Sequence, residues 1–177
     1  MELRGGAGAR RRLGEIQAQL LSARQTAKLP QQTLSDRLGV ASRTLRDWEK
    51  GYDTPSLRHL IFWAHALGFR LVIVDPFSSA ERPPFEQKGE EPFELREMRR
   101  LAHPLWSRRK ARKLSQTDLA LLLGVSRASV QRWEDVEKFP RPVALIAWAG
   151  RLDCSVELNQ ATNLVENPLS RPGGEMP

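Results

Sequence analysis

The chain of 177 residues has 28 basic and 21 acidic side chains, a net charge of +7, and a hydrophobic content of 40%, which is typical of one or two small globular domains. Its single cysteine, Cys154, excludes an internal disulfide and a cysteine-based metal cluster, favours a reducing compartment, and is expected to be a small buried hydrophobe. The N-terminal MELRGGAGARRR has no apolar signal core and no apolar run approaches about 18 residues, so we expect a soluble cytoplasmic protein without a membrane span.

The first part of the chain has apolar residues at helical spacing, which predict four helices. Their expected ranges are about 11–26, 31–38, 42–49 and 55–67. Thr54 is the expected N-cap of the last helix, with Pro55 at its first helical position. The stretch from Arg70 to Val74 then predicts a single strand. Residues 1–10, which precede the first helix, are expected to be disordered.

An acidic connector follows the first part of the chain. Residues 1–80 and 96–177 each carry a net charge of +5, whereas residues 81–95 carry −3. The connector sequence DPFSSAERPPFEQKGEEPFE is rich in proline and has no apolar period, which predicts a linker. Two basic bodies joined by an acidic linker suit a polyanionic partner, although charge alone does not identify that partner.

The second part of the chain predicts the same order of elements. Helices are expected at about 104–112, 116–123, 127–134 and 141–152, a strand at 154–158, and a disordered tail at 161–177. Ser115 and Asp118 have the spacing of a capping box. Because a proline inside a helix is costly, Pro104 predicts that residues 92–102 form a separate helix rather than an extension of the next one.

An internal repeat relates the two parts. When residues 20–67 are placed on residues 105–152, at a constant offset of 85, 18 of 48 positions are identical without a gap. Most identical residues are apolar, glycine or proline, the types that set a core and its turns. Two copies are too few for a solenoid. The sequence therefore predicts two similar small domains, at residues 10–76 and 93–160, with the linker at 77–92.

The centre of each copy has two short helices joined by a three-residue turn, GVA at 39–41 and GVS at 124–126. A helix-turn-helix results if the glycine ends the first helix in a left-handed conformation. The residues expected to face the core are Leu38, Val40, Leu45 and Trp48 in the first copy, and Leu123, Val125, Val130 and Trp133 in the second. The opposite face of the second helix differs almost completely between the copies. Such a difference is expected if the two helices recognise different nucleic-acid sequences.

The shared residues carry a family resemblance. The pattern Q-x-x-L-x-x-x-L-G-V, then W-E, then a proline-started helix ending L-x-x-W-A-x-x-L resembles the lambda-repressor-like (Cro or xenobiotic-response-element) helix-turn-helix family, over most of each copy. Members are five-helix DNA-binding domains, mostly transcriptional repressors of phages, plasmids and bacteria. The resemblance implies a mainly α fold of two tandem domains, in which the second helix of each motif enters the major groove of double-stranded DNA.

The resemblance also implies the residues that contact DNA. Base readers would be Ser42, Arg43, Arg46 and Asp47 in the first copy, and Arg127, Ala128, Gln131 and Arg132 in the second. The glutamines that open the preceding helices, Gln31 and Gln116, would hold the DNA backbone. Basic residues flanking these positions are expected to bind phosphate. They are Lys28, Lys50, Arg109, Lys110, Arg112, Lys113 and Lys138, beside the run at residues 10–12.

The sequence departs from the family pattern in two places. After Trp-Glu the first copy continues KGYDTPS, close to the family's turn, whereas the second has DVEKFPRP without a glycine. We therefore expect the second loop to lie differently on the DNA backbone. Each copy also ends in a strand where the simplest members stop. Because a lone strand leaves its backbone groups unpaired, the two strands are expected to pair about a pseudo-twofold axis.

Other chemistries have little support in the sequence. Four of the five tryptophans occupy equivalent apolar positions in the two copies, which favours core over base stacking, and only Trp106 has no counterpart. His59, His65 and His103 lack metal-ligand spacing, and no catalytic constellation is recognisable. We expect no cofactor, metal, small-molecule ligand or enzymatic activity.

The leading hypothesis is a sequence-specific regulator that binds double-stranded DNA, a repressor of the phage-immunity type. One chain would act as a monomeric pseudo-dimer on an asymmetric site. Two other functions stay open: a plasmid or phage partition or replication-control protein, and an antitoxin-like protein-interaction module. A homodimer with four readers is the alternative assembly.

Overall fold

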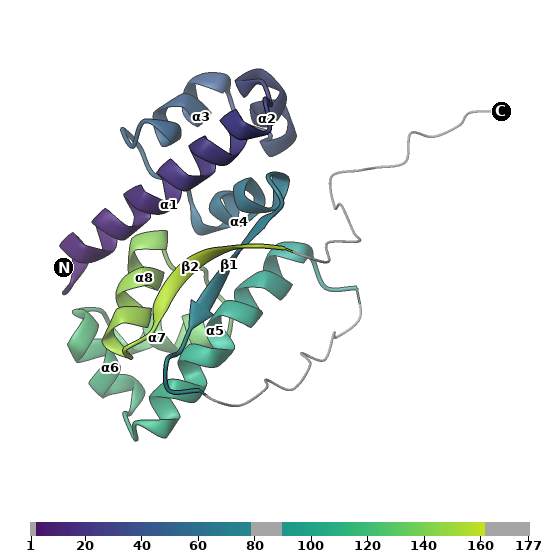
Figure 1. The fold of residues 1–177 in the computed structure, drawn as a ribbon. Helices are drawn as coiled ribbons and strands as arrows, with labels where there is room; N and C mark the ends of the chain where they lie inside the picture. The colour runs from purple at the N-terminus through teal and green to yellow at the C-terminus, as the bar shows by residue number, and fades with distance from the viewer. Residues whose placement is uncertain (1–2, 79–89, 162–177) are drawn as a thin grey trace.

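The computed structural model describes residues 3–78 and 90–161. The centre of the predicted linker and the predicted disordered tail from residue 162 onward lie outside the described residues. Within the described ranges the chain forms eight helices and two strands (Figure 1). In chain order these are α1 (Gly6–Thr26), α2 (Gln31–Leu38), α3 (Ser42–Glu49), α4 (Leu57–Ala66), β1 (Phe69–Val74), α5 (Phe93–Ala111), α6 (Gln116–Leu123), α7 (Arg127–Glu134), α8 (Pro142–Arg151) and β2 (Ser155–Gln160).

The two helix-turn-helix turns form as predicted. Gly39 ends α2 with a φ of 66°, and Gly124 ends α6 with a φ of 71°. Both glycines are left-handed, a conformation in which an L side chain would be strained. The predicted capping box is also present, since Asp118 N–H donates to Ser115 Oγ at 3.0 Å and Ser115 N–H donates to Asp118 Oδ2 at 2.9 Å. Local sequence signals therefore place both motifs correctly.

The apolar face predicted from the repeat forms the core of each domain. The buried members are Leu38, Leu45 and Trp48 in the first domain and Leu123, Val130 and Trp133 in the second, with the partly buried Val40 and Val125 packed against them. The ring centroids of Trp48 and Trp63 lie 6.0 Å apart, and those of Trp133 and Trp148 lie 5.8 Å apart. Cys154 is buried as expected, whereas Trp106 is 40% exposed. The repeat thus builds two equivalent cores.

Two predicted helix starts were wrong. α1 begins at Gly6 rather than near residue 11, because Gly6 and Ala9 are buried where α1 packs on α8, so residues 6–10 are helical instead of disordered. α4 begins at Leu57, with Ser56 rather than Thr54 as its N-cap. Ser56 Oγ accepts a hydrogen bond from His59 N–H at 3.2 Å, and this contact satisfies a donor of the first helical turn.

The prediction of a separate helix before Pro104 was also wrong, because α5 runs unbroken from Phe93 to Ala111 with Pro104 inside it. Met98, Leu101 and Leu105 are all buried, so one apolar face continues across the proline. Pro104 has no N–H to donate, which costs about 3 kcal/mol in a helix interior. Burial of the continuous face outweighs that local cost.

The strands β1 and β2 pair antiparallel, which confirms the predicted inter-domain sheet. Their register follows the repeat. Leu71 pairs with Leu158, whose counterpart is Ile73, and Ile73 pairs with Val156, whose counterpart is Leu71. Val72 pairs with its own counterpart, Glu157. A pseudo-twofold axis therefore passes through the centre of the strand pair.

The helices obey the same pseudo-symmetry. α1 of the first domain packs on α8 of the second, and the equivalent helices α5 and α4 also pack on each other. An arginine of each first helix reaches the strand of the other domain: Arg12 Nε donates to the carbonyl of Val156 at 3.1 Å, and Arg100 donates to the carbonyl of Leu71. Val156 and Leu71 are equivalent residues. The two domains thus form one body with a shared core.

Candidate nucleic-acid interface

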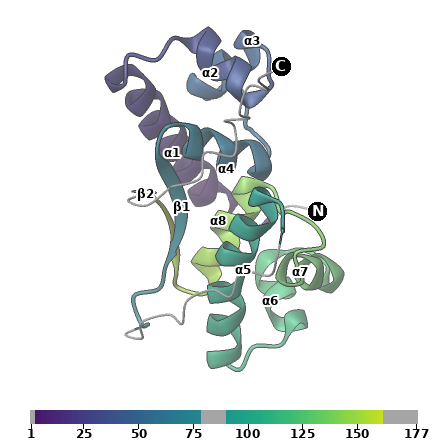
Figure 2. The same cartoon turned by 90° about the vertical axis from the view of Figure 1, so that its right-hand side faces the viewer.

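The second helices of the two motifs, α3 and α7, lie on the same side of the molecule. In Figure 2 the strand pair lies at the left, whereas α3 lies at the top, right of centre, and α7 lies at the right of the lower domain. Each helix packs on the first helix of its own motif, α3 on α2 and α7 on α6. The pseudo-twofold arrangement therefore places both second helices on one side of the molecule.

The first of these helices, α3, is amphipathic. Leu45 and Trp48 are buried, whereas the side chains of Arg43 and Arg46 are exposed on the opposite face. Asp47 is half-buried. The arginine guanidinium groups can present two parallel donors to guanine O6 and N7 in the major groove.

Ser42, at the start of α3, is held by residues of α2. Ser42 Oγ donates to Gln32 Oε1 at 2.5 Å, and Gln32 Nε2 donates to Asp36 Oδ1 at 2.8 Å. Ser35 Oγ lies 3.1 Å from the same hydroxyl. The hydroxyl proton of Ser42 is thus engaged within the protein, which leaves its oxygen to act as an acceptor. Sequence reasoning missed Gln32, because its counterpart in the repeat is Thr117 and no shared pattern marked it.

The helix α7 has the same geometry with different chemistry. Val130 and Trp133 are buried. The four predicted base readers, Arg127, Ala128, Gln131 and Arg132, are all exposed. Ser126 caps the helix by accepting a hydrogen bond from Ser129 N–H at 3.1 Å. The helix therefore presents a guanidinium at its first turn, where α3 presents the hydroxyl of Ser42.

The two residues of the recurring Trp-Glu pair have separate roles. The tryptophan packs in the core, and the glutamate forms an ion pair with an arginine. Arg24 Nε lies 2.5 Å from Glu49 Oε1, and Gln31 Nε2 donates to Glu49 Oε2 at 2.7 Å. In the second domain, Arg109 Nε lies 2.6 Å from Glu134 Oε1. Gln116 Nε2 donates to Glu134 Oε2 at 2.9 Å, so both domains contain the same three-residue network.

The network of the second domain gives Arg109 a structural role inside the protein. Arg109 is only 5% exposed, and it also donates to the carbonyl of Leu114 at 2.8 Å. Its expected contact with phosphate does not agree with this burial, and we remove it from the proposed interface. Gln31 and Gln116 are half-buried at the start of α2 and α6, where one amide donor of each is engaged by the glutamate.

The loops after α3 and α7 follow the same main-chain path, although the second loop lacks the glycine. The different placement of the second loop on the DNA backbone stays a prediction. Gly51 has a φ of 72°, and its counterpart Val136 has a φ of 58°. Tyr52 N–H donates to the carbonyl of Asp47 at 2.9 Å, and the equivalent Glu137 N–H donates to that of Arg132 at the same distance. The side chain of Val136 is buried, which offsets the strain of a β-branched residue in the left-handed region. The loops therefore differ in side chains and not in path.

Comparison with protein families identifies the repeated unit. The model of the helix-turn-helix family matches residues 20–74 and 107–158, which together make up more than half of the chain. The chain belongs to this family. The two matches confirm the lambda-repressor-like resemblance and its duplication. No curated protein and no solved structure matches the chain.

Members of the helix-turn-helix family bind DNA through the second helix of the motif. This chain is therefore a DNA-binding protein of the transcription-regulator type, and α3 and α7 are the second helices of its two motifs. None of the helices in the described part of the chain is both long and apolar enough to cross a membrane.

The predicted phosphate-binding side chains differ in how strongly the protein holds them. Lys28 and Lys113 are exposed at equivalent left-handed positions, with φ of 52° and 54°. Lys50 and Lys138 are exposed beyond the ends of α3 and α7, and Lys110 lies over the ring of Trp106 at 5.9 Å. Arg112 donates to the carbonyl of Arg151 at 2.8 Å and to Asp153 at 3.1 Å. Except for Arg109, these side chains stay candidates for phosphate contacts.

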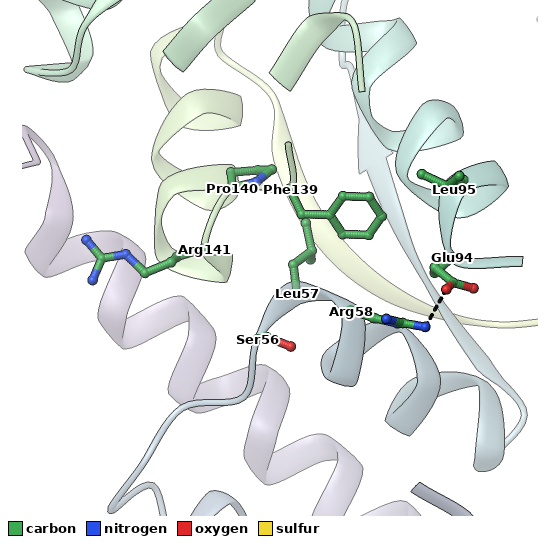
Figure 3. Close-up of a pocket in the computed structure, with 8 residues that line it drawn as sticks. All are labelled: Ser56, Leu57, Arg58, Glu94, Leu95, Phe139, Pro140 and Arg141. Atoms are coloured by element: carbon green, nitrogen blue, oxygen red, sulfur yellow. Dashed lines mark ion pairs between the residues drawn. The ribbon is translucent and has the colours of Figure 1, made fainter. Parts of the chain in front are cut away.

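A groove of about 460 Å³ separates the two domains on the side away from the strands (Figure 3). It is lined by Ser56, Leu57, Arg58, Glu94, Leu95, Phe139, Pro140 and Arg141. Ser56 and Arg141 occupy equivalent positions, so the groove lies near the pseudo-twofold axis. Arg58 Nη2 and Glu94 Oε1 form an ion pair at 2.6 Å across it. The groove therefore lies where α4 of the first domain meets α5 and the segment before α8 of the second.

Proposed function

We propose that this helix-turn-helix protein is a transcriptional repressor of the phage-immunity type that reads an asymmetric double-stranded DNA site with both recognition helices of one chain. The observation that carries the proposal is the placement of α3 and α7 on one side of a pseudo-twofold body (Figure 2). Two helices so placed fit successive major grooves on one face of DNA, with half-sites about one helical turn apart. Occupation of a promoter by such a protein blocks transcription from it in the cytoplasm.

The difference between the two reading faces supports an asymmetric site. The first turn of α3 offers Ser42 and Arg43, whereas that of α7 offers Arg127 and Ala128. Beyond the helices, Lys50 of the first domain corresponds to Asp135 of the second. Since hydrogen-bond donors, acceptors and charges differ at equivalent positions, the two half-sites differ in base sequence.

The test is selection of binding sites from random duplex DNA, followed by footprinting. Arg43→Ala and Arg127→Ala should each weaken binding by about 1–3 kcal/mol and relax base preference at a different half-site. Each variant serves as the control for the other, because each removes the same charge from an equivalent helix. A variant that keeps both affinity and preference would assign its domain a structural role.

The location of the selected sites distinguishes the functions that the sequence left open. Sites over promoters support repression, whereas sites clustered in arrays favour partition or replication control. Absence of DNA affinity even at low salt would favour an interaction module of the antitoxin kind. If two domains contact about 6–10 phosphates, log K should fall with log salt at a slope of about −5 to −9. A slope near −2 would mean that fewer than two domains dock fully.

A further inference from the structure

The N-terminal segment of the first domain contacts the helix-turn-helix of the second. Arg4 N–H donates to the carbonyl of Leu123 at 2.9 Å, and Arg4 Nη1 donates to the carbonyl of Leu121 at 3.2 Å. Leu123 is the last residue of α6, directly before the turn that leads into α7. Two hydrogen bonds therefore join segments more than 100 residues apart in sequence.

The physical setting favours this contact. The last carbonyls of a helix have no partner within the helix and carry partial negative charge, so an N–H donor and a cation are both stabilising there. Gly5 then turns the chain into α1 with a φ of 84°, a conformation that suits glycine. From Gly6 onward, the small buried residues Gly6 and Ala9 hold α1 against α8. The position of Arg4 is thus set by the inter-domain packing.

Arg4 contacts the helix-turn-helix of the second domain. The carbonyls equivalent to those of Leu121 and Leu123 belong to Asp36 and Leu38 of the first domain. The counterpart of Arg4 is residue 89, which lies outside the described residues. Arg4 itself follows no pattern of the repeat, so the sequence did not mark it.

We infer that Arg4 is a positioning residue for DNA recognition by α7: it braces the turn between α6 and α7 from the other domain, and so fixes the orientation of the second recognition helix. The inference rests on the proposed function only for its effect on DNA. The brace itself is a property of the protein without DNA. The two parts can therefore be tested separately.

Amide hydrogen exchange of the full chain without DNA tests the brace. Arg4→Ala removes the side-chain bond, and Arg4→Pro removes the main-chain donor as well. Exchange at Gly124 and Val125 should become about two- to tenfold faster for each bond lost. Exchange at the equivalent Gly39 and Val40 should not change. Arg11→Ala, which removes one exposed charge from α1, is the matched control. Unchanged exchange at Gly124 and Val125 in both Arg4 variants would overturn the inference.

Site selection with Arg4→Ala tests the effect on recognition. Arg4→Ala should lose preference at the base pairs that Arg127→Ala relaxes, and keep preference at those that Arg43→Ala relaxes. A uniform loss of affinity with a salt slope smaller by about 1 would instead mean a direct phosphate contact, and would overturn the positioning role. Faster exchange with unchanged base preference would also overturn it. If neither the parent protein nor any variant binds DNA, the proposed function is wrong. The exchange measurement still shows whether Arg4 braces the turn between α6 and α7.

Discussion

Arg24 and Arg109 show how a basic residue near a recognition helix can belong to the core. Each lies beside a glutamate that follows the tryptophan repeated in both copies, and the side chain of Glu134 is only 2% exposed. A buried carboxylate without its partner would be left uncompensated, which explains why arginine, glutamine and glutamate recur together in the repeat.

Arg109→Ala should lower the free energy of unfolding by about 3–5 kcal/mol, because it leaves the buried carboxylate of Glu134 without its cation. Urea unfolding followed by circular dichroism measures the change. Arg127→Ala, on the exposed face of α7, should stay within about 0.5 kcal/mol of the parent protein. A stable Arg109→Ala protein with weakened DNA binding would contradict the structural role and restore the phosphate contact.

His65 links stability to pH at the domain interface. It is 8% exposed, and its ring lies 4.5 Å from that of Phe93. Burial lowers the pKa of His65 below its ordinary value of 6.5, with Glu97 acting to raise it and Arg70 to lower it. The unfolded chain therefore binds a proton more readily than the folded one, so stability is lost as pH falls below 6.5.

Replacement of His65 by Gln should flatten this pH dependence. The free energy of unfolding of the parent protein should fall between pH 6.5 and 4.5, and that of His65→Gln should fall less. Glu97 adds its own loss of stability only near the lower end of this range. Burial raises its pKa, but Arg100 and Arg70 together hold the pKa below 4.5, so its contribution starts to be lost as the pH approaches 4.5 and continues to be lost below that value. The control variant is His103→Gln, which replaces an exposed histidine of α5. Identical profiles for His65→Gln and the parent protein would exclude the interface histidine as a cause.

At the scale of single elements, the helix-turn-helix depends on one left-handed residue. An added Cβ at Gly39 would meet no atom within 4 Å, so a substitution there acts through the backbone conformation alone. Gly14, inside α1, has equally open surroundings and an ordinary helical backbone. The two glycines therefore separate conformational strain from packing.

Gly39→Ala should destabilise the protein by about 1–2 kcal/mol, because alanine is strained in the left-handed region. Gly14→Ala should stabilise it by about 0.5–1 kcal/mol, since glycine loses more entropy in a helix interior. Thermal unfolding of both variants checks the opposite signs. Equal shifts in the same direction would show that the turn tolerates a side chain and that its glycine is not required.

At the scale of the whole molecule, the strand pair and the helices α1, α4, α5 and α8 join two domains into one pseudo-symmetric body. A homodimer of a single-domain repressor would place two identical faces on DNA. Here the duplication has let the faces diverge while the shared sheet keeps their geometry.

One chain should therefore bind one asymmetric duplex. Light scattering of the complex on a minimal duplex measures the stoichiometry, and a complex of two chains on a symmetric site would contradict the pseudo-dimer. Val72 and Glu157 lie opposite each other in the strand pair, at a separation that suits a disulfide. In a Cys154→Ala background, Val72→Cys with Glu157→Cys should oxidise within one chain, whereas Val72→Cys alone should not. A dimer seen without reductant would mean that strands are exchanged between chains.

The amino-acid sequence is enough to predict the repeat, the two helix-turn-helix motifs, their core residues and the strands that follow. These features depend on local signals: the 3.6-residue spacing of apolar side chains, a left-handed glycine and a capping box. The pairing of the strands also followed, because unpaired backbone groups would otherwise be left at an edge.

Other features could not be predicted, because in them long-range packing outweighs local conformational preference. Pro104 lies inside α5 because a buried apolar face continues across it, and Val136 takes a glycine-like conformation because its side chain is buried. The N-terminal residues are helical because α8 offers them a surface. Arg109, which the sequence placed among the phosphate-binding residues beside the motif, is buried because it pairs with Glu134, which lies 25 residues away in sequence and 2.6 Å away in space. Contacts between residues so far apart in sequence depend on how the helices pack, and a local sequence pattern does not predict them.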